Sequence, residues 1–169
     1  MMLTIAGIAS LAAVFNAVFP ALSRSSGAIV TSSAKIDERL RSDIEIIHAV
    51  GELDSSGAFA DSSPTNGVFE IFIWVKNVGD TRITSIENTD VFFGQVGSFS
   101  RIPHIVEVEA GVYPRWSHDV EGSANDTELN PRDTLKITID FDTVTQSQGS
   151  YDIKVTVPNG VTDEYFFSM

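Results

Sequence analysis

The sequence predicts an α+β protein, with a long hydrophobic N-terminal α-helix followed by an immunoglobulin-like antiparallel β-sandwich. The first observation is a run without any charged side chain over residues 1–23. The second is a helically spaced apolar stripe that continues to Ile47, and the third is a change to a period of two after Gly67. We therefore expect two parts, a hydrophobic and amphipathic helix within 1–50 and an outward-facing β-sandwich head over 51–169.

Residues 1–23 have the length and composition of a membrane-inserted helix. As a helix they would span roughly 34 Å, close to the thickness of the hydrocarbon core of a bilayer. Ala6, Ser10 and Ala13 follow the spacing of small residues that lets helices approach one another closely. A cleaved secretory signal would carry a basic start, and no Lys or Arg precedes this run. We therefore expect the run to belong to the mature protein and to lie in the membrane before assembly.

The apolar stripe predicts one helix over residues 2–49. Pro20 removes one backbone hydrogen bond and is expected to kink this helix. Charged side chains occupy the other faces beyond the proline, so the stripe needs a partner surface to cover it. The simpler interpretation is a membrane anchor with a stalk, and the alternative is a helix that packs against copies of itself. The residues predicted to carry this packing are Leu3, Ile5, Ile8, Leu11, Val14, Phe15, Val18, Leu22, Ile29, Ile36, Leu40, Ile44 and Ile47.

The head is predicted to contain about six to eight short strands. The segments "TLKITIDF" (134–141) and "YDIKVTV" (151–157) alternate apolar and polar side chains, as half-buried strands do. "PNG" at 158–160 predicts a turn into a hairpin partner. "VFEIFIWVKNVG" (68–79) is apolar on both faces, which predicts a central strand covered on both sides, and "IPHIVEVE" (102–109) is a further candidate strand. Short strands separated by turns favour an immunoglobulin-like sandwich.

The composition excludes several kinds of site. There is no cysteine, and therefore no disulfide, thiolate metal site or cysteine nucleophile. His48, His104 and His118 are far apart in the sequence, so we expect no metal and no cofactor. No nucleophile elbow, P-loop or dinucleotide motif occurs, and we expect no catalytic residues and no enzyme activity. The net charge of −12 lies entirely after residue 50, which excludes nucleic acid as a partner.

One short motif predicts a modification. Asn125 begins the triplet Asn-Asp-Thr, which fits the acceptor sequon for N-glycosylation. The surrounding stretch is polar and contains glycine, so we expect an exposed loop. The alternative is an ordinary unmodified loop, because such triplets also occur by chance. Asn125 is the predicted glycosylation site.

Several stretches resemble the archaellum proteins FlaF and FlaG, which are type IV pilin-like relatives of the archaellins. They include "FIWVKNVGDTRI", "TDVFFGQVGSFSRI", "NPRDTLKITI" and "VPNGVTDEYFFS". The most specific are the runs from Trp74 to Gly79 and from Asp90 to Gly94. The resemblance covers nearly the whole chain. It implies a structural, non-catalytic subunit of the archaellum, the rotary swimming filament of archaea, with a cell-surface location and an anchor in the cell membrane.

The resemblance leaves two roles open. The chain is either a filament subunit, polymerising as a helical homo-oligomer through its N-terminal helix, or a stator subunit that tethers the motor to the envelope beside other archaellum subunits. Type IV pilins carry a glutamate at the fifth mature position, where this chain has Ile5. No basic, glycine-ended leader precedes Met1, so we expect either a removed leader or a truncated start. A different class of function is a membrane-anchored binding module whose sandwich recognises a surface-layer protein or glycan.

Overall fold

A computed structural model describes residues 33, 36–37, 39–62, 66–123, 127–142 and 147–169. The chain divides into two compact units, 1–38 and 39–169. In the first unit the described residues Ser33, Ile36 and Asp37 are helical and exposed. No helix among the described residues has the length and hydropathy that crossing a bilayer requires.

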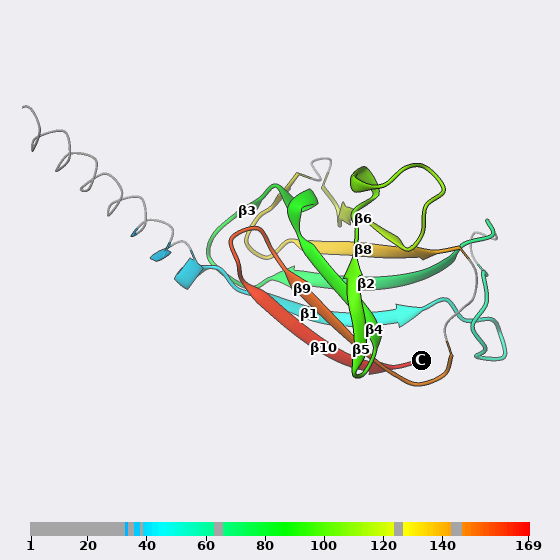
Figure 1. Cartoon of the computed structure of the whole chain (residues 1–169). Helices are drawn as coiled ribbons and strands as arrows, with labels where there is room; N and C mark the ends of the chain where they lie inside the picture. The colour runs from blue at the N-terminus through cyan, green and yellow to red at the C-terminus, as the bar shows by residue number, and fades with distance from the viewer. Residues whose placement is uncertain (1–32, 34–35, 38, 63–65, 124–126, 143–146) are drawn as a thin grey trace, which may run out of the picture. The chain divides into compact units, whose positions relative to one another are not determined.

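The second unit is an antiparallel β-sandwich, as predicted. One four-stranded sheet has the order β1-β2-β8-β6, formed by β1 (Ile44–Gly51), β2 (Phe69–Asn77), β8 (Thr134–Phe141) and β6 (Arg115–Val120). The other has the order β10-β9-β4-β5, formed by β10 (Thr162–Ser168), β9 (Ser150–Thr156), β4 (Asp90–Gln95) and β5 (Ser98–Ile102). Smaller elements are the pair β3 (Ile83–Thr84) and β7 (Glu128–Leu129) and the 3-10 turns η1 (Ile86–Asn88) and η2 (Ile105–Glu107). Figure 1 shows β9, β10 and the β4–β5 hairpin lying over β1, β2 and β8.

The core lies between the two sheets and follows the alternation of each strand. On β2 the inward side chains are fully buried, whereas Phe72 and Trp74 on the opposite face are only half-buried. The prediction that this strand is covered on both sides is therefore wrong for its outer face. The neighbouring strand β8 of the same sheet adds further inward aliphatic residues, with Ile139 paired opposite Ile71. The buried inward residues of β2 are Phe69, Ile71, Ile73 and Val75.

The predicted helix over 2–49 is wrong at its end, because β1 begins at Ile44. The last described helical residue is Arg41. Isoleucine is β-branched and favours strands, and "IEI" already alternates apolar with polar residues at the start of β1. Pairing of β1 with β2 then places two of its isoleucines in the sandwich core. The head therefore begins before residue 51, and the predicted boundary at residue 50 is too late.

Candidate functional site

The predicted assembly residues fall into three groups: exposed residues before β1, residues of β1, and residues outside the described part of the chain. Ile36 and Leu40 are described and are 60% and 80% exposed. Ile44 is buried in the sandwich core, and Ile47 lies on β1 with 46% of its surface exposed, so neither belongs to a helical stripe. Outside the described residues lie Leu3, Ile5, Ile8, Leu11, Val14, Phe15, Val18, Leu22 and Ile29, together with Pro20 and Asn125.

Residues 39–43 lead into β1, and the turn after β2 holds them by their backbone. Val78 and Gly79 donate their N–H groups to the carbonyl oxygen of Asp43 at 3.0 and 3.1 Å, and Asp80 donates to the carbonyl oxygen of Arg41 at 2.9 Å. A Cβ atom on Gly79 would lie 2.4 Å from the backbone nitrogen of Asp43, so this close approach requires glycine. We call Val78, Gly79 and Asp80 the junction clamp.

Buried polar side chains reinforce the junction clamp. Ser42, although a serine, is buried, and its hydroxyl accepts a hydrogen bond from Nδ2 of Asn159 at 2.7 Å and also bonds the hydroxyl of Thr81. Asn77 is fully buried and donates to the carbonyl oxygens of Thr81 and Leu129 at 2.9 and 3.0 Å. These contacts satisfy polar groups that would otherwise be costly to bury. The sequence patterns predict neither Ser42 nor Asn77 as a polar contact. The run "VKNVGD" indicates only that a turn containing Gly79 follows a strand.

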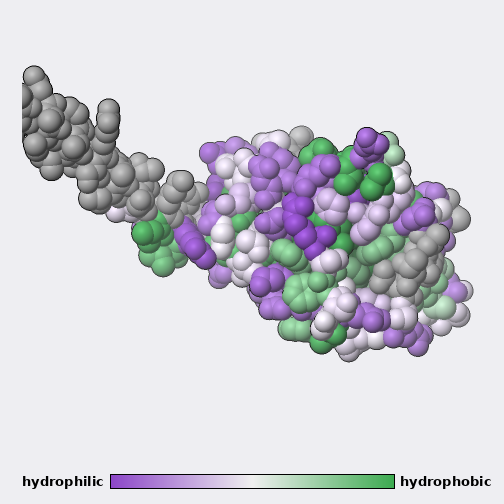
Figure 2. All heavy atoms as spheres, in the orientation of Figure 1, coloured by the Kyte–Doolittle hydropathy of each residue, from purple (hydrophilic) through white to green (hydrophobic). Residues whose placement is uncertain are grey.

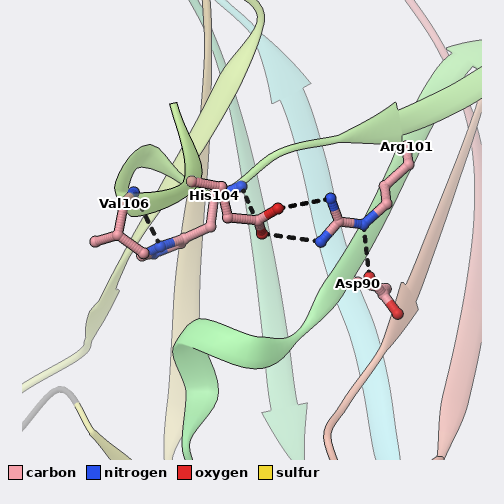
Figure 3. Close-up of polar contacts among 5 residues, drawn as sticks. Asp90, Arg101, His104 and Val106 are labelled. Carbon is pink, nitrogen blue, oxygen red and sulfur yellow. Dashed lines mark hydrogen bonds and ion pairs between the residues drawn. The ribbon is translucent and has the colours of Figure 1, made fainter. Parts of the chain in front are cut away.

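A second polar cluster anchors the η2 turn to β5. The guanidinium of Arg101 donates to both carboxylate oxygens of Glu107 at 2.8 Å and to Asp90 at 2.7 Å (Figure 3). A forked pair of this kind is directional as well as charged. Hydrogen bonding to Glu107 and then to Asp90 raises the pKa of Arg101, and the Arg101 bond lowers the pKa of Glu107.

His104 caps η2 from the other side. Its Nδ1 accepts the backbone N–H of Val106 at 3.4 Å, while its own backbone N–H donates to Glu107 (Figure 3). We therefore assign the proton of the neutral ring to Nε2, which donates to Nδ1 of His118 at 3.1 Å. Burial, and secondly the neighbouring His118, lower the pKa of His104. The ring also packs edge-on against Trp116, with 4.3 Å between the centroids.

The fold thus brings together two histidines that are distant in sequence. Both ring nitrogens of His104 take part in hydrogen bonds, so neither offers a lone pair to a metal ion. Over the described residues no three His, Asp or Glu side chains gather in a way that would hold a metal. The geometry therefore makes the pair a structural support for η2.

The anchored turn η2 and the loop that follows it present apolar side chains to solvent. Ile105, Val106 and Val112 are 39%, 74% and 46% exposed, and we call them the η2 surface. Figure 2 shows hydrophobic side chains gathered over this end of the head beside strongly hydrophilic ones. The stretch was a candidate strand in the sequence analysis, and that assignment is wrong because the capping contacts of His104 and Glu107 wind it into a 3-10 turn.

Known structures share the fold of the head. The periplasmic stator protein FlaG of the archaellum of Sulfolobus acidocaldarius is 23% identical, with a TM-score of 0.56 over 75% of this chain and 99% of that one. A chain of the periplasmic stator complex of FlaF and FlaG from the same organism is 24% identical, with a TM-score of 0.55 over 74% of this chain and 88% of that one. The flagellin FlaB1 of Methanocaldococcus jannaschii is 12% identical, with a TM-score of 0.53 over 76% of this chain and 90% of that one.

Sequence comparison extends beyond the head. An uncharacterized protein of Archaeoglobus fulgidus is 24% identical in an alignment that covers 98% of this chain and 93% of that protein. The family model of archaeal-type flagellins matches residues 2–167, and therefore both the apolar N-terminal segment and the β-sandwich. This chain belongs to the archaeal-type flagellin family.

Proposed function

We propose that this chain is a non-catalytic structural subunit of the archaellum that assembles with other copies through its N-terminal segment. Its family supports a structural rather than an enzymatic role. The observation that carries the proposal is the exposure of Ile36 and Leu40, at 60% and 80%, just before the head. A single copy therefore leaves the apolar surface of both side chains in water. Packing it against another subunit would be favourable by about 25 cal/mol per Å².

The junction clamp supports the same role. A subunit that is fixed at one end and faces outward at the other must pass force through the residues between. Here residues 41–43 are tied to the turn after β2 by three backbone hydrogen bonds and by the hydroxyl contact of Ser42 with Thr81, and Ser42 is also bonded by Asn159 in the turn before β10. We infer that the chain lies in the cell membrane before assembly and at the cell surface afterwards, among other archaellum subunits.

Two roles within the archaellum share this architecture, since the head resembles both a stator protein and a flagellin. A filament subunit would be the most abundant protein of purified appendages. A stator subunit of the FlaF or FlaG type would be a minor component that remains with the cell envelope. Mass spectrometry of purified appendages and of the envelope fraction separates the two roles.

Leu40→Glu tests assembly through the N-terminal segment. A charge on this exposed apolar position should prevent subunits from packing and should leave the β-sandwich folded, because the side chain is 80% exposed in one copy. The matched control is Ile47→Glu, which puts the same charge on the half-exposed bulge of β1 and should permit assembly. Normal appendages from Leu40→Glu, or an equal loss from both variants, would contradict the proposal.

A binding module is the second candidate function, and the η2 surface favours it. In this alternative the N-terminal segment is only an anchor, and the head recognises a surface-layer protein or glycan. Removing residues 1–30 discriminates the two. Full affinity of the remaining monomer for its envelope partner supports the binding module, whereas loss of both assembly and binding supports the structural subunit.

Glycosylation of Asn125 remains a prediction, because Asn125 lies outside the described residues. Intact mass spectrometry of the native protein tests it. A mass in excess of the sequence mass, lost in an Asn125→Gln variant, is expected. A native mass equal to that of the unmodified sequence removes the prediction.

A further inference from the structure

β5 is an exposed strand at the outer edge of its sheet. It pairs with β4, and residues 98–101 are all exposed. The hairpin turn at Val96 and Gly97 places Gln95 opposite Ser98, and antiparallel strands alternate bonded and non-bonded pairs from there. Phe99 and Arg101 therefore direct their N–H and C=O groups away from β4. Within the described residues, neither backbone makes a hydrogen bond outside the β4–β5 ladder.

At two other edge strands, β1 and β6, a backbone N–H group is engaged where the structure describes them. The N–H of Ile46 on β1 donates to the carboxylate of Asp163 on β10. The N–H of Trp116 on β6 donates to the carbonyl oxygen of Pro103. Open strand edges are templates for pairing with another chain, and natural proteins usually block them. Among the described residues, the edge of β5 is therefore a place where another strand fits.

The residues of β5 are complementary to a second copy of themselves. If two β5 strands run antiparallel with Ser100 opposite Ser100, Phe99 of each copy faces Arg101 of the other. This is the register in which the free N–H and C=O groups of both residues meet. On the outer face the flat guanidinium, which Asp90 and Glu107 hold in place with 41% of the side chain exposed, lies against the phenyl ring. The ring itself is braced edge-on by Phe92, with 6.2 Å between the centroids.

On the inner face this register places small side chains at the centre. Ser98 and Ser100 line a cavity of about 250 Å³, together with Phe93, Phe141 and Pro114. Serine at inward positions is unusual for a sandwich strand, which normally fills this space with apolar side chains. Two strands can therefore approach at Ser100 without a clash between large groups.

We propose that β5 pairs antiparallel with β5 of a second copy about Ser100, which joins the two four-stranded sheets edge to edge. The pairing rests on the proposed function in one respect, because assembly through the N-terminal segment brings copies together and raises their effective concentration. Assembly therefore increases the pairing of such a short edge but is not required for it. The head carries 9 basic and 21 acidic residues over 39–169, a net charge of −12, so the pairing strengthens as salt screens the repulsion.

Cysteine cross-linking tests the pairing and its register, since the chain has no native cysteine. Full-length Ser100→Cys is oxidised in the membranes of cells that express it. In the proposed register the two Cα atoms lie about 4.5 Å apart, within disulfide range. The matched control is Ser98→Cys, on the same face of the same strand, where the two cysteines would lie roughly 13 Å apart. A disulfide dimer from Ser100→Cys and none from Ser98→Cys is expected. No dimer from Ser100→Cys, or equal dimers from both, overturns the proposal.

A second pair of variants tests the Phe99–Arg101 contact. In the Ser100→Cys chain, Phe99→Lys sets two cations opposite each other and should reduce the dimer several-fold, while Phe99→Tyr should retain it. Unchanged dimer from Phe99→Lys would overturn the register. Combining Ser100→Cys with Leu40→Glu separates this pairing from assembly through the N-terminal segment. A dimer from that chain supports the edge pairing even where assembly fails, whereas a Ser100→Cys chain that assembles but never cross-links overturns the pairing alone.

Discussion

The carboxylate of Asp163 accepts the backbone N–H of Ile46 at 2.7 Å. Asp163 points inward from β10, and Ile46 lies on β1 of the opposite sheet, where the register shifts at a β-bulge. Since β1 is the edge strand of its sheet, this backbone donor has no partner strand, and the carboxylate supplies the acceptor. One side chain thus closes the side of the sandwich where β1 and β10 lie next to each other.

Asp163→Ala should destabilise the sandwich by about 1–3 kcal/mol, because it leaves the Ile46 N–H partly buried without an acceptor. Denaturant unfolding of the full chain in mild detergent measures this loss. Asp163→Asn is the matched control, since it keeps an oxygen at the same place and should lose less. Equal stability of Asp163→Ala and the unmodified protein would show that water replaces the carboxylate.

Gly79→Ala should disrupt the junction clamp. The added Cβ would lie 2.4 Å from the nitrogen of Asp43 and 2.8 Å from the carbonyl oxygen of Arg41, and backbone atoms cannot move aside as a flexible side chain can. We expect a loss of about 1–3 kcal/mol in the free energy of unfolding. Gly149→Ala is the control, because its nearest neighbour is a glutamine side chain at 3.7 Å. Comparable stability of the two variants would contradict the close approach at Gly79.

Several strands of the head were predictable because their side chains alternate. β8 spans Thr134–Phe141, the segment that the pattern predicts, and β9 and β10 flank the predicted turn. The exception was β1, where Ile44 and Ile47 also fit a helical spacing. Only pairing with β2, a contact between residues far apart in sequence, decides between the two patterns. Local periodicity alone does not contain that information.

The polar clusters were less predictable than the strands. Arg101, Glu107 and His104 come from one short stretch, yet their contacts depend on a 3-10 turn. The apolar residues of this stretch indicated a strand instead. His118 joins them because β6 runs beside the segment that leads into η2, with Trp116 opposite His104. Such contacts follow from tertiary packing, which neither spacing nor composition encodes.

Arg101→Lys should loosen η2 without unfolding the head. Lysine keeps the charge but loses the fork that binds both oxygens of Glu107. The pair is 41% and 38% exposed, so we expect a global loss of only about 0.5–1 kcal/mol. The measurable effect is faster hydrogen exchange of the Val106 amide, whose acceptor His104 depends on the turn. Arg82→Lys, which alters a single ion pair to Glu128, should leave this exchange unchanged.

Acid should destabilise the head through His104. Burial and His118 lower the pKa of this ring, so the unfolded chain takes up the proton more readily than the folded chain does. The stabilisation is therefore complete above the unfolded value of about 6.5 and is lost as the pH falls below it. The added proton would go to Nδ1, which accepts the Val106 N–H, so protonation of His104 removes this hydrogen bond. We expect the free energy of unfolding to fall between about pH 7 and pH 5.

His104→Asn isolates this effect from the carboxylates. Asparagine keeps an oxygen that can cap the Val106 N–H but does not titrate. Burial raises the pKa values of Glu70 and Asp152, so these groups bind protons more readily in the folded state and gain stability on acidification, opposite to His104. They are common to both proteins, as are Asp54 and Glu107, whose pKa values are lowered chiefly by Ser56 and Arg101. The difference between the two pH profiles therefore belongs to the histidine, including its contribution to the pKa of Glu107. If His104→Asn loses stability below pH 6.5 as steeply as the unmodified chain, protonation of His104 does not oppose folding, and the assignment of its ring as a neutral support for η2 is wrong.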